Sequence, residues 1–298
     1  MTQPVFRFAP SPNGLLHLGH AYSALLNAEL AGRSGGRFLV RIEDIDPTRC
    51  RPEFEQAIYD DLAWLGLAWE EPVRRQSEHI VEYAARLDEF KSRGLVFPCF
   101  CSRRAIAAAV SAREAETAAP WRRDPDGAPL YPGICRDLGA AEAGRRIAAG
   151  AAHAWRLDIA AALEAASPWL AYRRLAPDAA ESLIAARPER WGDTVMARTE
   201  VPTSYHLSVV LDDAVQGVTH VVRGQDLEAA TDLHVLLQDL LRLPTPRYRH
   251  HPLIRDSEGD KLSKSLLSES LAELRARGVS AAEVRRRLGF EGHPTPST

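Results

Sequence analysis

Two short motifs near opposite ends of the chain constrain its fold most, HLGH at His17–His20 and KLSKS at Lys261–Ser265. The first closes a stretch from Arg7 that is typical of a strand, a proline-rich turn and a helix start. The second contains two of the three lysines in the chain, whose other basic residues are arginines. A compact ammonium on a flexible stem suits a phosphate group. The two motifs together therefore predict a nucleotide-activating enzyme.

The bulk composition narrows the class of protein. With 298 residues, 45% of them hydrophobic, the chain can bury a substantial core, in one large domain with an insertion or in two modest domains. The sequence has no apolar run of about 18 residues and no signal-peptide core, which predicts a cytoplasmic protein without a membrane partner. The net charge of −3 gives no overall attraction to nucleic acid, so any RNA contact needs local arginine clusters.

Strand and helix patterns alternate in the first third of the chain and again near its end. The first third predicts strands over 5–8 and 37–42 and helices over 17–31, 53–65 and 78–92. This alternation favours an α/β fold with a doubly wound parallel sheet. The later part predicts strands over 194–198, 218–222 and 251–254, and helices over 205–215, 226–241, 271–277 and 281–288.

The middle of the chain has a different pattern. It predicts a strand over 95–101, an alanine-rich helix over 103–118, a loop over 120–132, a strand over 153–159 and weak periodicity over 160–190. We therefore divide the chain into four segments. They are the first half of a Rossmann-like catalytic domain (1–96), an insertion (97–192), the second half of the catalytic domain (193–255), and the KLSKS loop with a short helical C-terminus (256–298).

The motif residues suit the activation of a carboxylate by ATP. Negative charge builds on the α-phosphate during that reaction, so catalysis depends on positioning and electrostatic stabilisation. A helix N-terminus behind a turn attracts phosphate, and His17 and His20 project from one face of its first turn. Gly19 leaves room for adenine and ribose near the backbone. Lys261 and Lys264 are expected to close over the β- and γ-phosphates.

Five segments carry a resemblance to a known family: FAPSPNGLLHLGH, RIEDIDP, SYHLSVVLDD, VTHVVRGQDL and KLSKS. In combination they resemble the class I aminoacyl-tRNA synthetases of the glutamyl/glutaminyl branch. HLGH and KLSKS differ from the family's usual HIGH and KMSKS only by exchanges of apolar residues. The resemblance implies catalytic roles for the two histidines and the two loop lysines. It places ATP, with its Mg²⁺, at Pro10, His17, Gly19, His20 and Lys264.

The same resemblance implies a glutamate pocket. Its residues are Arg7, Phe8, Ala9, Ser11, Glu43, Tyr205 and Arg223. Within this set, Arg7 and Tyr205 would hold the side-chain carboxylate and Arg223 the α-carboxylate. Glu43, with the Ser11 hydroxyl, would receive the ammonium. Both arginines end predicted strands, where Rossmann-type sites gather ligands, although arginines more often form surface ion pairs. His206 fits a core contact and a substrate contact equally well.

The part of the chain after KLSKS, 33 residues long, is too short for the anticodon-binding domain of a usual glutamyl or glutaminyl enzyme. This short form resembles the glutamyl-queuosine tRNA(Asp) synthetase family. That family activates L-glutamate without tRNA and attaches it to queuosine in the anticodon loop of tRNA(Asp). The resemblance implies L-glutamate, ATP and queuosine-bearing tRNA(Asp) as partners of a monomer.

Three alternatives stay open. One is a minimal glutamyl-tRNA synthetase that charges the 3′ end of tRNA(Glu). Another is a noncatalytic RNA-binding relative, which the intact His17, His20 and Lys264 disfavour. A simple nucleotidyltransferase would also use an HxGH turn, but it lacks the RIEDIDP and VVRGQDL context.

A cysteine pattern in the insertion predicts a metal site. Cys99, Cys101, Tyr131 and Cys135 match the CxC…YxxxC zinc pattern of the resembled family. Three thiolates and a phenolate would give one closed, structural Zn²⁺ site. The alternative is three free thiols and an ordinary tyrosine, and Cys50 has no partner in the sequence. Around this pattern lie arginines that either neutralise RNA phosphate or are simply solvated: Arg103, Arg104, Arg122, Arg123 and Arg136.

Overall fold

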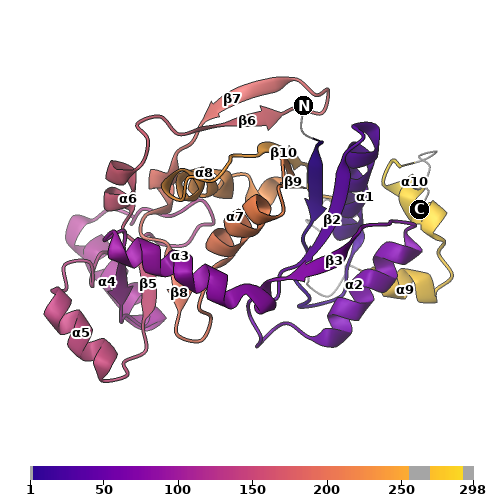
Figure 1. The fold of residues 1–298 in the computed structure, drawn as a ribbon. Coiled ribbons are helices and arrows are strands. Elements are labelled where there is room, and N and C mark those ends of the chain that lie inside the picture. Colours follow the sequence, from indigo (N-terminus) through magenta and orange to yellow (C-terminus); the bar gives the residue numbers. More distant parts are fainter. Residues whose placement is uncertain (1–2, 255–268, 291–298) are drawn as a thin grey trace.

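The computed structural model describes residues 3–254 and 269–290 (Figure 1). Its strands are β1 Val5–Phe8, β2 Arg37–Ile42, β3 Glu70–Arg75, β4 Val96–Cys99, β5 Ala154–Leu157, β6 Ala171–Leu175, β7 Glu181–Ala185, β8 Val195–Arg198, β9 His220–Gly224 and β10 Arg247–His251. Its α-helices are α1 Leu18–Arg33, α2 Pro52–Trp64, α3 Ile80–Ser92, α4 Arg103–Thr117, α5 Ala140–Ala148, α6 Ile159–Ala165, α7 Tyr205–Val215, α8 Ala230–Leu240, α9 Leu271–Ala276 and α10 Ala281–Arg287. Three short 3₁₀ helices are η1 Gln76–His79, η2 Pro188–Trp191 and η3 Gln225–Leu227.

A large sheet forms the body of the described chain. Its strand order is β3-β2-β1-β9-β10-β6-β7, and every neighbouring pair is parallel except β6 and β7. The chain leaves β1 toward β2 and later returns to the other side of β1 as β9. In a doubly wound sheet this reversal opens a crevice at the carboxyl ends of the strands, where ligands bind. The predicted Rossmann-like class of fold is confirmed.

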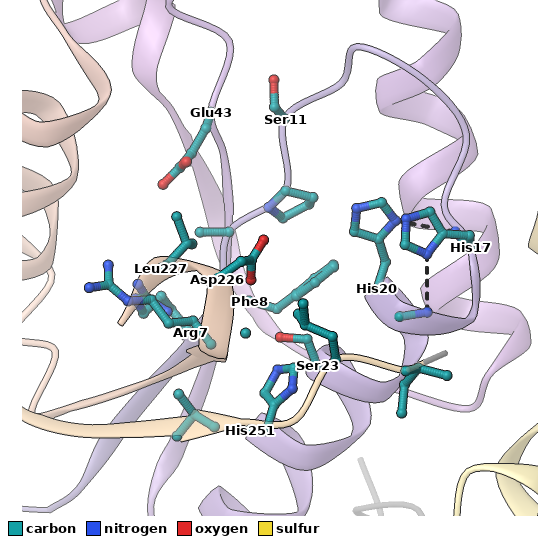
Figure 2. Close-up of a pocket in the computed structure, with 18 of the residues that line it drawn as sticks. Arg7, Phe8, Ser11, His17, His20, Ser23, Glu43, Asp226, Leu227 and His251 are labelled. Atoms are coloured by element: carbon teal, nitrogen blue, oxygen red, sulfur yellow. Dashed lines mark hydrogen bonds between the residues drawn. The ribbon is translucent and has the colours of Figure 1, made fainter. Parts of the chain in front are cut away.

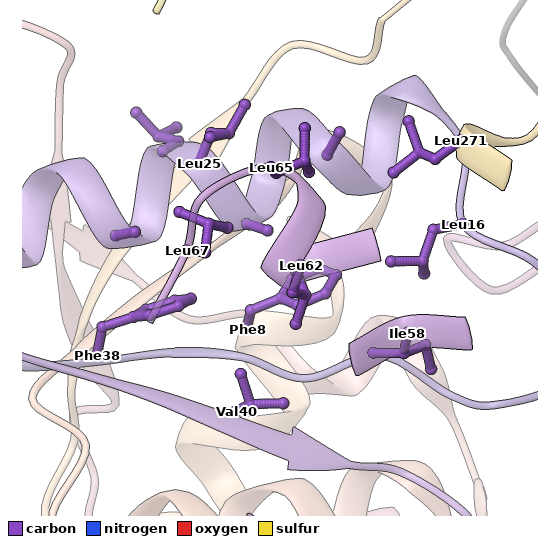
Figure 3. Packing of buried hydrophobic residues seen from close by; sticks show 14 of the residues in the cluster. Phe8, Leu16, Leu25, Phe38, Val40, Ile58, Leu62, Leu65, Leu67 and Leu271 are labelled. Atoms are coloured by element: carbon purple, nitrogen blue, oxygen red, sulfur yellow. The ribbon is translucent and has the colours of Figure 1, made fainter. Parts of the chain in front are cut away.

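A hydrophobic core fixes helix α1 against the sheet (Figure 3). Leu25 of α1, Phe8 of β1 and Leu62 of α2 belong to one buried cluster, which Leu271 of α9 joins from the far end of the sequence. A fully buried leucine contributes about 1.5–3 kcal/mol relative to an exposed one. This packing holds the N-terminus of α1 at the end of β1, and it brings the C-terminal helices beside it.

A second, antiparallel sheet has the order β4-β5-β8, and the helices α4 and α5 lie at the same end of the molecule (Figure 1). Its membership differs from the sequence expectation, because β8 was expected in the parallel sheet. Conversely, β6 and β7 fall within the predicted insertion but extend the large sheet. Strands of four or five residues do not identify their partners by pattern alone. The four-segment division of the chain stays a prediction.

Four elements differ further from the sequence expectation. β3 was not predicted, because its sequence EEPVRR is charged and contains Pro72, which suits an edge strand. α5 and α6 were not predicted either. The final strand is Arg247–His251, and the expectation of 251–254 was wrong. Its polar side chains resemble a loop in sequence, although Tyr248 is buried between its neighbours. No helix within the described ranges has the length and apolarity needed to cross a bilayer.

Candidate functional site

A cavity of about 300 Å³ opens where β1 and β9 end and α1 begins (Figure 2). Every predicted ATP- or glutamate-binding residue within the described ranges lines it: Arg7, Phe8, Ala9, Pro10, Ser11, His17, Gly19, His20, Glu43, Tyr205 and Arg223. In Figure 2, Arg7 and Glu43 lie at one side of the cavity and His17 and His20 at the other. Lys261 and Lys264 lie outside the described residues.

The two motif histidines cap helix α1 and are fixed by the backbone. Nδ1 of His17 accepts a hydrogen bond from the Gly19 N–H at 3.1 Å, and Nδ1 of His20 accepts one from the His17 N–H at 3.2 Å. The ring centroids are 3.9 Å apart. Because Nδ1 is an acceptor in both rings, the neutral imidazoles carry their proton on Nε2. The pair is therefore preorganised as two N–H donors of known tautomer.

The structure gives a specific reason for the glycine between these histidines. A Cβ atom at residue 19 would lie 3.0 Å from Cε1 of His17, closer than side chains normally pack. Gly19 therefore makes room for the His17 ring. The sequence expectation assigned that room to adenine and ribose, which stays a prediction.

Arg7 belongs to a buried ionic network. Its Nε donates to Oδ1 of Asp213 at 3.1 Å, and Nη1 of Arg41 donates to the same oxygen at 2.8 Å. Nη2 of Arg41 also donates to Glu43 at 3.2 Å. Arg41 is fully buried, so its charge depends on these carboxylates. The network fixes Arg7 and Glu43, which face the cavity, from behind.

Burial and charge act in opposite directions on the two carboxylates of this network. Burial alone would raise the pKa of Asp213, but the adjacent Arg7 and Arg41 hold it below its usual value. For Glu43, burial is the largest influence and raises its pKa above the ordinary value, although Arg41 and Arg7 oppose the shift. Asp213 is thus a firmly charged support. Glu43, whose pKa is raised, accepts a proton more readily than an exposed glutamate does.

Arg223 differs from Arg7 because its partners are neutral. Its guanidinium donates to the Tyr205 hydroxyl at 3.3 Å, to Nδ1 of His234 at 3.2 Å and to Oγ1 of Thr231 at 2.9 Å. Burial, reinforced by Arg223 itself, lowers the pKa of His234 well below its usual value, so that imidazole is uncharged. Among the described residues no carboxylate forms an ion pair with Arg223, which is 5% exposed. A buried cation in this setting is suited to a carboxylate ligand.

The structure groups Tyr205 with Arg223, whereas the sequence expectation groups it with Arg7. Burial raises the pKa of Tyr205, so its hydroxyl keeps its proton. Because that oxygen accepts from Arg223, its O–H is directed elsewhere and is available to a ligand oxygen. Arg223 and Tyr205 thus form one hydrogen-bonded unit whose donors suit an anion.

Several cavity residues were not predicted from the sequence. They are Ser23, Val222, Gly224, Asp226, Leu227, His251, Leu253 and Ile254. Among them, Gly224 is the residue whose type could have indicated a role, because a Cβ atom there would lie 2.4 Å from Oδ1 of Asp226. The glycine that follows Arg223 therefore permits the turn that returns Asp226 to the cavity.

The described residues on either side of the KLSKS segment both lie at this site. Ile254 lines the cavity, and Ser270 forms an isolated bridge with His17. The Leu271 N–H also donates to the Leu16 carbonyl at 2.8 Å. Segments from opposite ends of the sequence are therefore joined directly beside the histidine pair.

The cysteine pattern forms a compact cluster. The sulfur atoms of Cys99, Cys101 and Cys135 all lie within 4.8 Å of one another. The Tyr131 hydroxyl oxygen is 3.3 Å from the Cys99 sulfur and 3.5 Å from the Cys101 sulfur, and it accepts from the Cys135 N–H at 2.8 Å. The four residues predicted to bind zinc thus converge on one point.

The donor set of this cluster fits a metal ion. Three sulfurs and one oxygen suit a tetrahedral site, and the cluster can hold such an ion. Burial raises the pKa of Cys101 to about 11, whereas the Tyr131 hydroxyl and Arg156 outweigh burial at Cys99 and lower its pKa. Without an ion most of these groups stay protonated, and a bound cation would remove their protons.

A second cavity of about 640 Å³ lies between the cysteine cluster and the first cavity. Tyr131 is part of its wall, and Tyr205 lines both cavities. Of the arginines considered for RNA, Arg103 lines this second cavity, whereas Arg136 forms an ion pair with Asp193. Arg123 donates to the Gly127 carbonyl within its own loop. These three arginines therefore have different local environments and do not form one basic patch.

Comparison with known proteins agrees with this geometry. The model of the family "tRNA synthetases class I (E and Q), catalytic domain" matches residues 4–294. The structure of a glutamate tRNA ligase from Elizabethkingia meningosepticum shares the fold, with a TM-score of 0.71 and 23% identity over 93% of this chain and 53% of that one. The chain belongs to the catalytic-domain family of class I tRNA synthetases, which are ligases.

Relatives in sequence define the branch. A glutamyl-Q tRNA(Asp) synthetase from Rhodobacter capsulatus is 49% identical over 96% of this chain and 100% of its own length. A protein of the same name from Thiobacillus denitrificans is 38% identical over 98% of this chain and 86% of its own length. A glutamate–tRNA ligase 2 from Nitrosococcus oceani is 37% identical, and the match spans 59% of that protein. Within class I, the chain groups with the glutamyl-Q tRNA(Asp) synthetases.

Proposed function

We propose that this protein activates L-glutamate with ATP, without tRNA, and transfers the glutamyl group to queuosine in the anticodon loop of tRNA(Asp). One observation carries the proposal. A single cavity joins a charged end, suited to an amino acid with two carboxylates, to a pair of oriented imidazole donors at a helix N-terminus. The names of the relatives in sequence support the choice of acceptor.

In the first step, Arg223 with Tyr205 holds one carboxylate of glutamate and Arg7 holds the other. Glu43 and Ser11 receive the ammonium. The α-carboxylate oxygen attacks the α-phosphorus of ATP, a new P–O bond forms, and the bond to pyrophosphate breaks. The Nε2–H groups of His17 and His20 stabilise the charge that develops on the phosphate. Mg²⁺ that accompanies ATP would neutralise further charge on the phosphates.

The loop lysines Lys261 and Lys264 complete the site in this proposal by binding the β- and γ-phosphates. Support comes from the two described flanks of their segment, since Ile254 lines the cavity and Ser270 pairs with His17.

We assign one structural Zn²⁺ to Cys99, Cys101, Tyr131 and Cys135. When bound, the ion would supply a cross-link between the end of β4 and the loop before α5, with no part in the reaction. The residues themselves order the wall of the second cavity through Tyr131. The protein acts as a cytoplasmic monomer in this proposal.

The test separates the two chemical steps. Exchange of labelled pyrophosphate into ATP, with glutamate and without RNA, measures activation. Transfer of labelled glutamate to tRNA(Asp) with and without queuosine measures the second step. We expect exchange without RNA and transfer only to the queuosine-bearing tRNA. Lys264→Ala should abolish most of the exchange.

Transfer that ignores queuosine and instead charges the 3′ end of tRNA(Glu) would favour a minimal glutamyl-tRNA synthetase. Absence of exchange in a folded sample would refute the activation step itself.

A further inference from the structure

The two cavities meet at consecutive residues of one helix. Tyr205 lines both cavities, and His206, the next residue of α7, lines only the second. The glutamyl group would form in the first cavity, so an acceptor must approach from a connected space. The second cavity shares the Tyr205 wall with the first and is therefore the neighbouring space from which we expect that approach. This reasoning rests on the proposed function.

A chain of buried and partly buried hydrogen bonds connects His206 to the proposed glutamate site. Arg223 donates to Nδ1 of His234 at 3.2 Å, and Nε2 of His234 lies 3.1 Å from Nδ1 of His206. Since the guanidinium is always a donor, Nδ1 of His234 must accept and its proton must lie on Nε2. His234 then donates to Nδ1 of His206. The same rule places the His206 proton on Nε2.

The proton-bearing nitrogen of His206 remains for a ligand. No described residue forms a hydrogen bond with its Nε2, and that atom is not among the buried polar atoms without partners. The ring is packed at an angle against Trp191, with centroids 5.4 Å apart, which restricts its rotation. Burial, followed by the charge of Arg223, lowers the pKa of His206 to about 4. The imidazole is therefore a neutral donor at pH 7 and a poor base.

We propose that the second cavity receives the vicinal diol of the acceptor nucleoside, and that His206 is a positioning residue whose Nε2–H donates to a diol oxygen. The other diol oxygen attacks the carbonyl carbon of the glutamyl-adenylate. An ester C–O bond forms, the C–O bond to AMP breaks, and the hydroxyl proton passes to the departing phosphate. Because His206 is held through His234 and Arg223, the group that orients the acceptor is fixed by the group that binds the amino acid.

Two substitutions at His206 distinguish the contributions of its two ring nitrogens. His206→Asn keeps a polar atom near Nδ1, for His234, but removes the donor at Nε2. His206→Gln reaches the Nε2 position with an amide N–H. His79→Asn is the matched control, because His79 pairs with Glu82 on the surface and lines neither of these cavities. Each variant is assayed for pyrophosphate exchange, and then for single-turnover transfer from preformed adenylate.

The acceptors distinguish the two sources of a vicinal diol: queuosine in tRNA(Asp) and the 3′-terminal ribose of tRNA(Glu). Periodate-treated RNA, whose diols are cleaved, is the negative control. We expect His206→Asn to keep exchange within about twofold and to lose about tenfold or more in transfer, as for one lost hydrogen bond. His206→Gln should recover part of that loss.

Unchanged transfer by His206→Asn, or an equal loss of exchange and transfer, would overturn the inference. If wild-type protein charges only tRNA(Glu), the queuosine proposal fails, and the role of His206 is decided on that acceptor instead. Transfer to neither acceptor by a protein that still performs exchange would refute both.

Discussion

The first cavity and the cysteine cluster are both dense groups of ionisable side chains, but their charges are compensated in different ways. Around the cavity, Arg7 and Arg41 are paired with Asp213 inside the protein. In the cluster, the polar atoms of Cys99 and Tyr131 face one another with only a weak hydrogen bond between them. The cavity is therefore organised by the chain itself, whereas the cluster, in our proposal, is complete only with a cation.

This contrast implies different sensitivities. Loss of one charged partner in the cavity network leaves an uncompensated buried charge, which is costly. Loss of the ion from the cluster returns thiols and a phenol to neutral forms that burial tolerates. Substitution of a charged residue should therefore destabilise the cavity network most, whereas chelation of the metal should mainly affect the cysteine cluster.

The largest effect is expected for Arg41→Met. Arg41 is fully buried and faces Glu43, Asp212 and Asp213, so its loss should cost about 3–5 kcal/mol in free energy of unfolding. Urea denaturation measures the change. Arg33→Met is the control, because the Arg33 side chain is 71% exposed and its ion pair is worth about 0.5 kcal/mol or less. Equal effects of the two substitutions would contradict the buried-network account.

The next largest effect is expected for Arg223→Ala, which removes from the cavity a cation that pairs with no carboxylate among the residues the structure describes. Loss of one partner of a buried charge pair costs about 2–5 kcal/mol, so glutamate-dependent pyrophosphate exchange should fall about 100-fold or more. The KM for glutamate should rise more than the KM for ATP. Arg247→Ala, at an exposed pair with Glu181, should change neither. A rise confined to the KM for ATP would exclude the assigned role.

Removal of the metal should lower the melting temperature without abolishing the fold. An ion present at about 100 times its Kd contributes about 2.7 kcal/mol, and each kcal/mol shifts the midpoint by about 2–4 °C, so chelation should lower it by about 5–10 °C. Differential scanning calorimetry with elemental analysis tests this. Cys135→Ser should contain no zinc and should not respond to the chelator, whereas Cys50→Ser should retain one ion. A wild-type protein purified without zinc, and indifferent to added zinc, would disprove the site.

A smaller effect is expected for Tyr131→Phe. The phenol oxygen is the only non-sulfur donor of the proposed set, and its loss should weaken zinc binding about tenfold, near the lower limit for groups that support a metal site. Competition with a coloured chelator measures the affinity. An unchanged affinity would show that Tyr131 supports the sulfurs without binding the ion.

The smallest effect concerns pH. Burial raises the pKa of Glu43 above its ordinary value of 4.5, so acidification protonates Glu43 while exposed glutamates are still charged. The neutral acid no longer attracts the substrate ammonium, and the KM for glutamate should rise several-fold as the pH falls through that range. Glu43→Gln should show a high KM that does not vary with pH there. Glu70→Gln, at the edge strand, should behave as wild type.

The sequence predicted the residues that line the cavity better than the residues that hold them in place. Arg7 directly precedes a motif segment and Glu43 and Arg223 lie within two others, so the sequence could predict that all three belong to one site, and they line one cavity. The support of Arg7 by Asp213 joins residues 206 positions apart, and no local pattern reports such a pair. Similarly, the histidine chain from Arg223 to His206 depends on how α7 packs against α8. Motifs identify the atoms that meet the substrate, whereas tertiary packing selects the atoms that hold them.

The connection between β8 and α7 has a mechanical consequence. β8 belongs to the antiparallel sheet that follows the cysteine cluster, and the chain then leads directly into the helix that begins with Tyr205. β4, which ends at Cys99, is paired to β8 through β5. Met196 of β8 and Leu207 of α7 also belong to one buried hydrophobic cluster. A displacement of the antiparallel sheet is therefore transmitted to the helix that begins at Tyr205 both along the chain and through packed side chains.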